Sequence, residues 1–472
     1  MAFMLAAGVR AIPEVLAGVY PVGWDTIAFY VPTTFYWAAG KAGVFAIIGS
    51  APLIYLVSVP LFMAGLDPVW TFKLMGPILY GLFSVSLLTF FSRSLKWAGR
   101  NALAGGLLTS LYFVTLRIGW DMYRSISGLS FLLLALSLAT DAGDVRRRLA
   151  LATSIFLAVV SDQFTGAMAI VIVGAIACLQ LYKRNRSQSF NLLKALAPGF
   201  LTFGLIAYAE SISFNTLYPS QPPLGMSWTI TNSVVFLGYA YLPLLPFALV
   251  GIRNARSFEM ALWSLICLTG AVVSAIPFMG MQALGYRWCL LLTVPLCVYA
   301  ASGLSRIAHA SLSNPEWLRL LRVNAPRLFA IFLIISALSY MLLPPQHPAA
   351  YFSAYPSLIP TSMSQNTIPL SDSASVVELI HWLGSNMSPS SVLITHQSLY
   401  GWALEYLPAS VAIMNYGYGT PLDGAKIAVS RGYSSILLIW WANGAGWFGQ
   451  TTVPDGFSKI RSDGDFAIYE YA

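Results

Sequence analysis

Long apolar runs constrain this chain more than any other feature of its sequence. Only 9% of its 472 residues are charged and 57% are hydrophobic, whereas soluble domains carry roughly 25% charged residues. A helix that crosses a bilayer needs about 20 mostly apolar residues, so the shorter runs must extend into their flanks. We therefore expect an α-helical polytopic membrane protein. The runs that fit a crossing are residues 69–91, 101–116, 126–140, 192–208, 234–252, 260–280, 288–304 and 328–343.

Clusters of Lys and Arg orient these runs, because basic loops favour the cytoplasmic side. One further run, residues 149–181, lies between two such clusters and must cross an even number of times; we expect two short legs that turn at residues 161–163. Residues 49–65, which contain Pro52 and Pro60, are predicted to be re-entrant or to lie in the outer interface. With residues 1–12 included, about eleven spans result. The net charge of +8 then belongs to cytoplasmic loops, and nucleic-acid binding is not indicated. The clusters are Arg93/Lys96/Arg100, residues 146–148, residues 183–186, Arg253/Arg256 and Arg306/Arg319/Arg322/Arg327.

The predicted domains are a transmembrane domain at residues 1–343, a linker at 344–372 and an extracytoplasmic α/β domain at 373–472. The transmembrane domain includes a large outer loop at residues 13–68. In the C-terminal domain helix and strand patterns alternate, which is typical of a small α/β sheet. It has no glycine-rich phosphate-binding motif, and a packing or recognition module is the simplest alternative. The predicted helices are 374–383, 402–407 and 421–431, and the predicted strands are 391–395, 411–416, 435–441 and 465–471.

A single carboxylate stands out in the first outer loop. Asp25 lies in the segment YPVGWDTIAFYVP beside the aromatic residues Trp24 and Tyr30. An interfacial aromatic belt with an incidental acid is one interpretation. The other is a general base, because transfer to an acceptor hydroxyl needs a carboxylate within about 3 Å of that hydroxyl. In the second case the aromatic neighbours would stack on a sugar.

Other ionisable residues are predicted at the same membrane boundary, where such groups are candidates for a functional site. Arg287, next to Tyr286, either extends to the headgroups or binds a phosphate. The predicted short outer loop 117–124 contains Arg117, Asp121 and Arg124. One interpretation is a structural Arg–Asp ion pair. The other is a second acid near the site, with the arginines as cations for the leaving phosphate. Asp162, followed by Gln163, either caps a helix or contacts substrate. Lys41 is a further candidate for the donor phosphate.

The four cysteines lie in apolar runs and form no CxxC pair. Neither a disulfide framework nor a zinc site is therefore expected.

The pattern resembles the GT-C superfamily of membrane glycosyltransferases. The segments that carry the resemblance are GWDTIAFYVP, with Asp25 in the acid position, APLIYLVSVPLFMAGLDP, the Asp121/Arg124 segment and GYRWCLLLTVPLCVYAASGL, with Arg287 in the basic position. The resemblance implies an inverting transfer of a sugar from a polyprenyl-phosphate donor on the outer face. Asp25 and Asp121 would be catalytic, Arg287, Arg124 and Lys41 would bind the donor phosphate, and Trp24, Tyr30, Asp162, Gln163 and Tyr286 would bind substrate.

The same resemblance narrows the reaction. Some branches bind a divalent metal through paired acids, but this first loop has no DxD, so a metal is disfavoured and no cofactor is assigned. The WWDYG motif of oligosaccharyltransferases is absent at residues 395–402, which read THQSLYGW. The expected partners are the membrane, the lipid-linked sugar and a lipid, glycan or protein acceptor. A lipid or polysaccharide transporter or flippase and a non-catalytic scaffold are the alternatives. A transporter would predict repeated halves with mid-membrane sites, and no internal repeat is visible.

Overall fold

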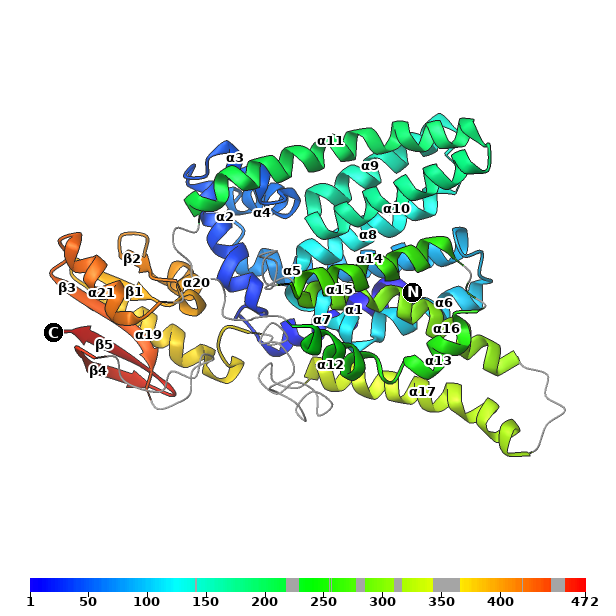
Figure 1. Cartoon of the computed structure of the whole chain (residues 1–472). Helices are drawn as coiled ribbons and strands as arrows, with labels where there is room; N and C mark the ends of the chain where they lie inside the picture. Colours follow the sequence, from blue (N-terminus) through cyan, green and yellow to red (C-terminus); the bar gives the residue numbers. More distant parts are fainter. Residues whose placement is uncertain are drawn as a thin grey trace.

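The computed structural model of the chain consists of a large helical body and a smaller α/β domain near the C-terminus (Figure 1). The structure describes residues 1–140, 142–217, 229–253, 255, 257–276, 285–309, 316–342, 366–417, 419–442 and 455–472. Most of the predicted linker, residues 344–365, and the end of the run 260–280 lie outside this part of the chain.

The N-terminal part of the body alternates long and short helices. Asp67 caps α5, where its side chain accepts a hydrogen bond from the Trp70 amide. The short α3 and α4 come from the predicted interfacial segment 49–65 and its N-terminal flank. A break at residues 50–52 separates them, and α4 spans 11 residues, too few to cross a bilayer. The helices are α1 (Ala2–Leu16), the π-helix η1 (Thr26–Tyr30), α2 (Val31–Ala38), α3 (Val44–Gly49), α4 (Leu53–Met63), α5 (Pro68–Arg93), α6 (Gly99–Leu111), α7 (Phe113–Asp121) and α8 (Tyr123–Ala139).

The rest of the body contains the predicted two-legged hairpin. Its legs, α9 and α10, meet at Asp162, which confirms the turn predicted at residues 161–163. In Figure 1 the hairpin lies alongside α11. The helices are α9 (Val145–Ser161), α10 (Gln163–Tyr182), α11 (Arg186–Leu217), α12 (Ile230–Tyr241), α13 (Leu245–Gly251), α14 (Phe258–Ser274), α15 (Gly285–Leu291), α16 (Thr293–His309) and α17 (Glu316–Leu342).

Among the described residues, five helices are long and apolar enough to cross a membrane, or up to seven if two bent pairs each count as one span. The bent pairs are α6 with α7 (63°) and α12 with α13 (87°). Shorter apolar helices, including α8 and α14, accompany them. These helices support an integral membrane protein, and the total of about eleven crossings stays a prediction.

The C-terminal domain is a five-stranded sheet in the order β2-β1-β3-β5-β4. The first three strands in that order are parallel, and β5 and β4 add antiparallel. The predicted strands 391–395 and 435–441 are confirmed at the same bounds, and β4 was not predicted. The elements are η5 (Leu370–Asp372), α19 (Ser373–Asn386), β1 (Ser391–Thr395), α20 (Gln397–Tyr406), β2 (Ala412–Asn415), α21 (Pro421–Ser430), β3 (Ser435–Trp441), β4 (Phe457–Asp463) and β5 (Phe466–Tyr471).

The α/β domain packs on the helical body through α20. The Gln397 side chain donates a hydrogen bond to the Ala28 carbonyl at 2.9 Å, and the rings of Trp402 and Tyr20 lie 6.4 Å apart. A Cβ on Gly401 would collide with the Ile27 carbonyl oxygen. One hydrophobic cluster runs from η1, α4 and α5 into the sheet. The segment that contains Asp25 therefore lies at the junction of the two parts.

Candidate active site

Asp25 immediately precedes η1, a single π-turn, a type of irregular helix frequent at functional sites. Two residues earlier, Gly23 has φ of +99°, and a Cβ there would overlap the side chain of Asp121. Glycine is thus needed at this position both for its conformation and for the close approach of the two segments.

Asp121 lies directly against this loop. The backbone N–H of Asp25 donates to Asp121 Oδ2 at 3.2 Å, and Arg117 Nη1 donates to Asp121 Oδ1 at 2.5 Å. Arg117 and Asp121 are 4% and 0% exposed. The ion pair considered from the sequence is therefore present, and it is buried.

The predicted outer loop at residues 117–124 is wrong. Arg117 and Asp121 belong to α7, and only Met122 separates α7 from α8. Every residue of α7 is buried, so the helix brings its charged side chains to the Asp25 loop from inside the body. The sequence shows no Pro or Gly at the bend between α6 and α7, so residues 101–116 read as one straight span that ends before Arg117.

The surroundings of Asp25 raise its pKa to about 6. Burial of the half-buried carboxyl is the largest cause and the charge of Asp121 is the second, while Arg287, Arg117 and Arg124 act in the opposite direction. An aspartate poised near neutral pH suits proton transfer, because a general base works best when its pKa lies near the operating pH.

Arg287 and Tyr286 begin α15 and complete one side of the site. Arg287 Nε donates to the Tyr286 hydroxyl at 3.3 Å, and its guanidinium lies 5.8 Å from the centre of the Phe164 ring. The charge of Arg287 interacts with the charges of Asp25 and Asp162. The structure thus brings together Asp25, Asp121 and Arg287, which lie far apart in the sequence.

Asp162 and Gln163 have structural partners. Asp162, 2% exposed, caps α10 by accepting from the Thr165 amide at 3.1 Å, as expected for an N-cap aspartate. The Gln163 amide donates to the Gly49 carbonyl at 3.2 Å and to Glu210 at 2.8 Å. These contacts join the hairpin turn to α3 and α11.

Among the other candidates, Tyr30 is 4% exposed, and its ring packs 5.5 Å from both Tyr123 and Phe72. Tyr30 therefore packs in the core under the Asp25 segment. Trp24 is half-buried. Arg124 acts on Asp25 through its charge, and its Nε is buried with no hydrogen-bond partner among the described residues.

Lys41 is exposed on the loop between α2 and α3. Within the described part of the chain, its ammonium makes no ion pair or hydrogen bond with the other candidates.

Several residues of the site environment were not singled out from the sequence. Arg10, Glu14 and Lys73 form a buried charged cluster beneath the loop. For Arg10 and Lys73 the sequence carries a signal, because both lie inside predicted apolar runs, where ionisable residues are candidates for a functional site. Glu14 is one of the acids of the predicted first outer loop. Asn366, whose Oδ1 accepts from the Gly23 amide at 2.6 Å, gave no signal in the sequence.

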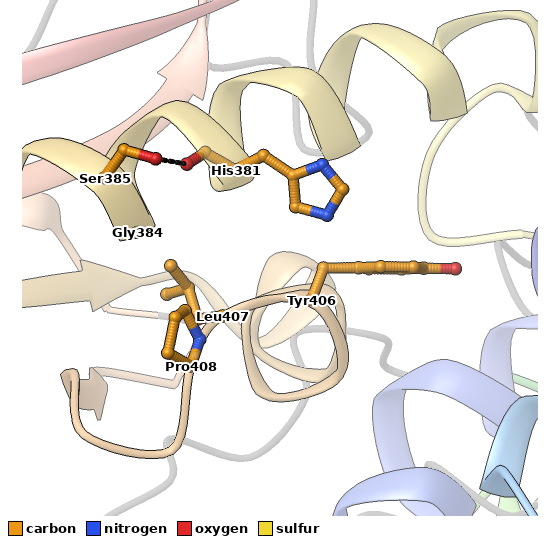
Figure 2. Close-up of a pocket in the computed structure, with 6 residues that line it drawn as sticks. All are labelled: His381, Gly384, Ser385, Tyr406, Leu407 and Pro408. Atoms are coloured by element: carbon orange, nitrogen blue, oxygen red, sulfur yellow. Dashed lines mark hydrogen bonds between the residues drawn. The ribbon is translucent and has the colours of Figure 1, made fainter.

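The C-terminal domain has a surface hollow of its own. The hollow, of about 470 Å³, lies between α19 and α20, lined by His381, Gly384, Ser385, Tyr406, Leu407 and Pro408 (Figure 2). In Figure 2 the ring of His381 extends toward Tyr406, and the two ring centres are 6.2 Å apart. None of the residues predicted for the site lines this hollow.

A second hollow, of about 280 Å³, lies between the helical body and the α/β domain and includes Asp67 and Glu405 in its lining. Burial, followed by the proximity of Asp67, raises the pKa of Glu405 to about 9. Asp67 and Glu405 line the same hollow, so α20 lies next to the start of α5 there.

Within the described ranges, no three His, Cys, Asp or Glu side chains are grouped so that they could hold a metal ion.

No protein-family model and no curated protein matches this chain. Among solved structures, the chain is similar to ArnT from Cupriavidus metallidurans bound to undecaprenyl phosphate, with a TM-score of 0.55 and 13% identity, over 100% of this chain and 97% of that chain. The apo state of the same protein gives a TM-score of 0.55 and 13% identity, over 99% and 97% of the two chains. The mycobacterial arabinofuranosyltransferase AftD matches with a TM-score of 0.54 and 13% identity, over 99% of this chain but 40% of that chain.

At this level of identity the likeness concerns the fold, and it extends over essentially the whole chain. The chain therefore shares the fold of ArnT and of AftD.

Proposed function

We propose that this protein transfers a sugar from a polyprenyl-phosphate-linked donor to an acceptor hydroxyl, with inversion at the anomeric carbon. The observation that supports this most is the convergence of Asp25 with Asp121 and three arginines. These residues come from the first loop, α7, α8 and α15, and their charges interact around the Asp25 carboxyl.

In this mechanism Asp25 is the general base. Its carboxylate accepts the proton of the acceptor hydroxyl as the hydroxyl oxygen forms a bond to the anomeric carbon. The bond between that carbon and the phosphate oxygen breaks, and its electron pair leaves with the phosphate. A positioned base of this kind contributes about 10²–10⁴-fold to a rate.

The arginines supply the charge that the leaving group requires. Arg287 and Arg124 are proposed to bind the phosphate, since a guanidinium can bind two phosphate oxygens at once. Arg117 is already paired with Asp121. We assign that pair to holding the Asp25 loop through the Asp25 backbone amide. Donors fixed in advance around developing charge are among the largest contributions to catalysis.

The neighbouring structure of ArnT was solved with undecaprenyl phosphate, and this supports a polyprenyl-phosphate lipid as the donor carrier here. The positive-inside pattern favours the outer side of the membrane for the Asp25 loop and the α/β domain. The acceptor would then be a lipid, glycan or protein on that face.

The test is sugar transfer in membranes that contain the full chain, with a panel of polyprenyl-phosphate sugars. Wild type should transfer one of them, and Asp25→Asn should lose at least about 10²-fold in kcat. Asp455→Asn, at an exposed turn of the α/β domain, is the matched control and should behave as wild type. Unchanged transfer by Asp25→Asn would refute the assignment of the base, and product with retained anomeric configuration would refute the direct displacement.

A further inference from the structure

A cluster of three ionisable side chains lies buried in the helical body. Arg10, Glu14 and Lys73 are 0%, 6% and 4% exposed. Arg10 and Glu14 lie one turn apart on α1 and are joined at 2.7 Å, and Lys73 on α5 reaches the Glu14 carboxylate at 3.2 Å. The mechanism above gives none of the three a role in catalysis.

Lys73 holds the start of the loop that leads to Asp25. Its ammonium donates to the carbonyl oxygens of Glu14 and Tyr20, each at 2.9 Å. The chain leaves α1 just after Glu14, and Tyr20 lies five residues before Asp25. These bonds therefore fix the path of the loop relative to α5.

Arg10 holds the other half of the site. Its Nε donates to the Gly119 carbonyl at 2.7 Å, and its Nη2 donates to the Trp120 carbonyl. These carbonyls precede Asp121 at the C-terminal end of α7, where the last helical carbonyls have no partner within the helix and favour positive charge. Arg10 Nη2 also lies 3.3 Å from the Tyr123 hydroxyl, which accepts from Thr26 beside Asp25 at 3.4 Å.

Burying three charged side chains is unfavourable if they serve packing alone. Each buried charge loses its hydration, and apolar residues of similar size often fill such a space as well or better. The hydrogen bonds of the cluster are directed at backbone carbonyls of the two segments that bring Asp25 and Asp121 together. The donors are thus placed where they set the distance between those segments.

We propose that Arg10, Glu14 and Lys73 are positioning residues that fix the Asp25 loop against the Asp121 end of α7. The proposal rests on the proposed function and adds how the site keeps its geometry. When the cluster is broken, the loop loosens while the substrate-binding arginines remain. Rate should then fall far more than substrate binding.

Loosening of the Asp25 loop should also change the dependence of kcat on pH. Burial and the charge of Asp121 are the two largest contributions that raise the pKa of Asp25. A loop that moves away from Asp121 loses both, so the pKa of Asp25 falls. The acid limb of the profile of kcat against pH should therefore move to lower pH, which a loss of stability alone would not cause.

The experiment compares Lys73→Met and Glu14→Gln with wild type in the transfer assay, using the full chain. We expect kcat to fall by about 10²-fold, as for a displacement of about 1 Å, with KM within threefold and the acid limb shifted downward. Lys194→Met, on the exposed face of α11, is the matched control. Arg10→Lys, which keeps one donor group, should lose less activity than Arg10→Met.

The possible results distinguish failure of the positioning role from failure of the glycosyltransferase assignment. Absence of transfer by wild type with every donor tested would overturn the glycosyltransferase assignment. If wild type is active and Asp25→Asn is inactive, unchanged kcat and pH profile in folded Lys73→Met and Glu14→Gln would overturn the positioning role alone. Glu14→Gln preserves the side-chain volume, so it decides the question if Lys73→Met fails to fold.

Discussion

The segment between α1 and α5 has two halves that differ in how they are held. In the first, the backbone groups of Tyr20, Gly23, Asp25 and Ala28 are bonded to side chains at least 53 positions away. The second half, from Gly40 to Leu66, contains two short helices and exposes large apolar side chains such as Val44 and Met63. Its bonds within the turns are mostly local.

This difference separates two tasks. In the first half, hydrogen bonds to residues distant in the sequence hold the backbone around Asp25 in position, as a catalytic group requires. The exposed apolar side chains of the second half suit contact with lipid, as in interfacial helices. Asp25 and Lys41 therefore have very different surroundings, although both belong to the predicted outer loop 13–68.

The strongest test of this comparison uses two glycines with positive φ, Gly23 at +99° and Gly40 at +65°. A Cβ at Gly23 overlaps Asp121, whereas nothing lies within 4 Å of a Cβ at Gly40. Gly23→Ala should lower kcat by about 10²-fold, and Gly40→Ala should cost about 1–2 kcal/mol of backbone strain with near-normal transfer. Transfer rates and thermal unfolding measure both effects. Equal losses of activity in the two variants would contradict the division of the loop.

A second test follows from the pKa of Asp25, which is raised to about 6. Below this pH the carboxyl is protonated and cannot accept a proton, so kcat should fall about tenfold per pH unit there and level off above it. Asp121→Asn removes a negative charge that raises this pKa, and should move the acid limb to lower pH. Rates between pH 4.5 and 8 measure the shift. A limb that stays at pH 6 in Asp121→Asn would argue that burial alone sets the pKa.

A third test concerns the support that the first half receives from the α/β domain. Gln397→Ala removes the bond to the Ala28 carbonyl and should cost about 1 kcal/mol, typical of a hydrogen bond. Thermal unfolding of the solubilised protein measures the loss. Asn386→Ala, whose side chain bonds within its own helix on the surface, is the control. An equal effect in both would mean that Gln397 does not contribute to docking.

The smallest effect is expected at Lys41. Because its side chain is exposed, Lys41→Ala should leave kcat within twofold of wild type. A modest, salt-dependent rise in the KM for the donor would indicate long-range attraction of the phosphate. A loss of kcat as large as that of Asp25→Asn would place Lys41 in the site and would break the comparison.

The sequence predicted the elements better than their contacts. Periodicity and charge gave the turn at Asp162 and the strands β1 and β3, because local patterns and basic flanks determine these features. The burial of α7 was not predicted, because its bend at Tyr112 carries no Pro or Gly. The bonds of Asn366 and Gln397 to the first loop join residues more than 340 positions apart, and no local pattern reports such pairs.

The contact of Gly401 with Ile27 has a mechanical consequence. The two backbones approach so closely that no other residue would fit at Gly401 without displacing Ile27, and Ile27 is only two residues from Asp25. We therefore expect a shift of the α/β domain to displace Ile27 and, with it, the segment that carries the proposed base. A molecule that binds the domain and shifts α20 would change the position of Asp25, and so the rate of transfer, although it touches neither sugar nor phosphate.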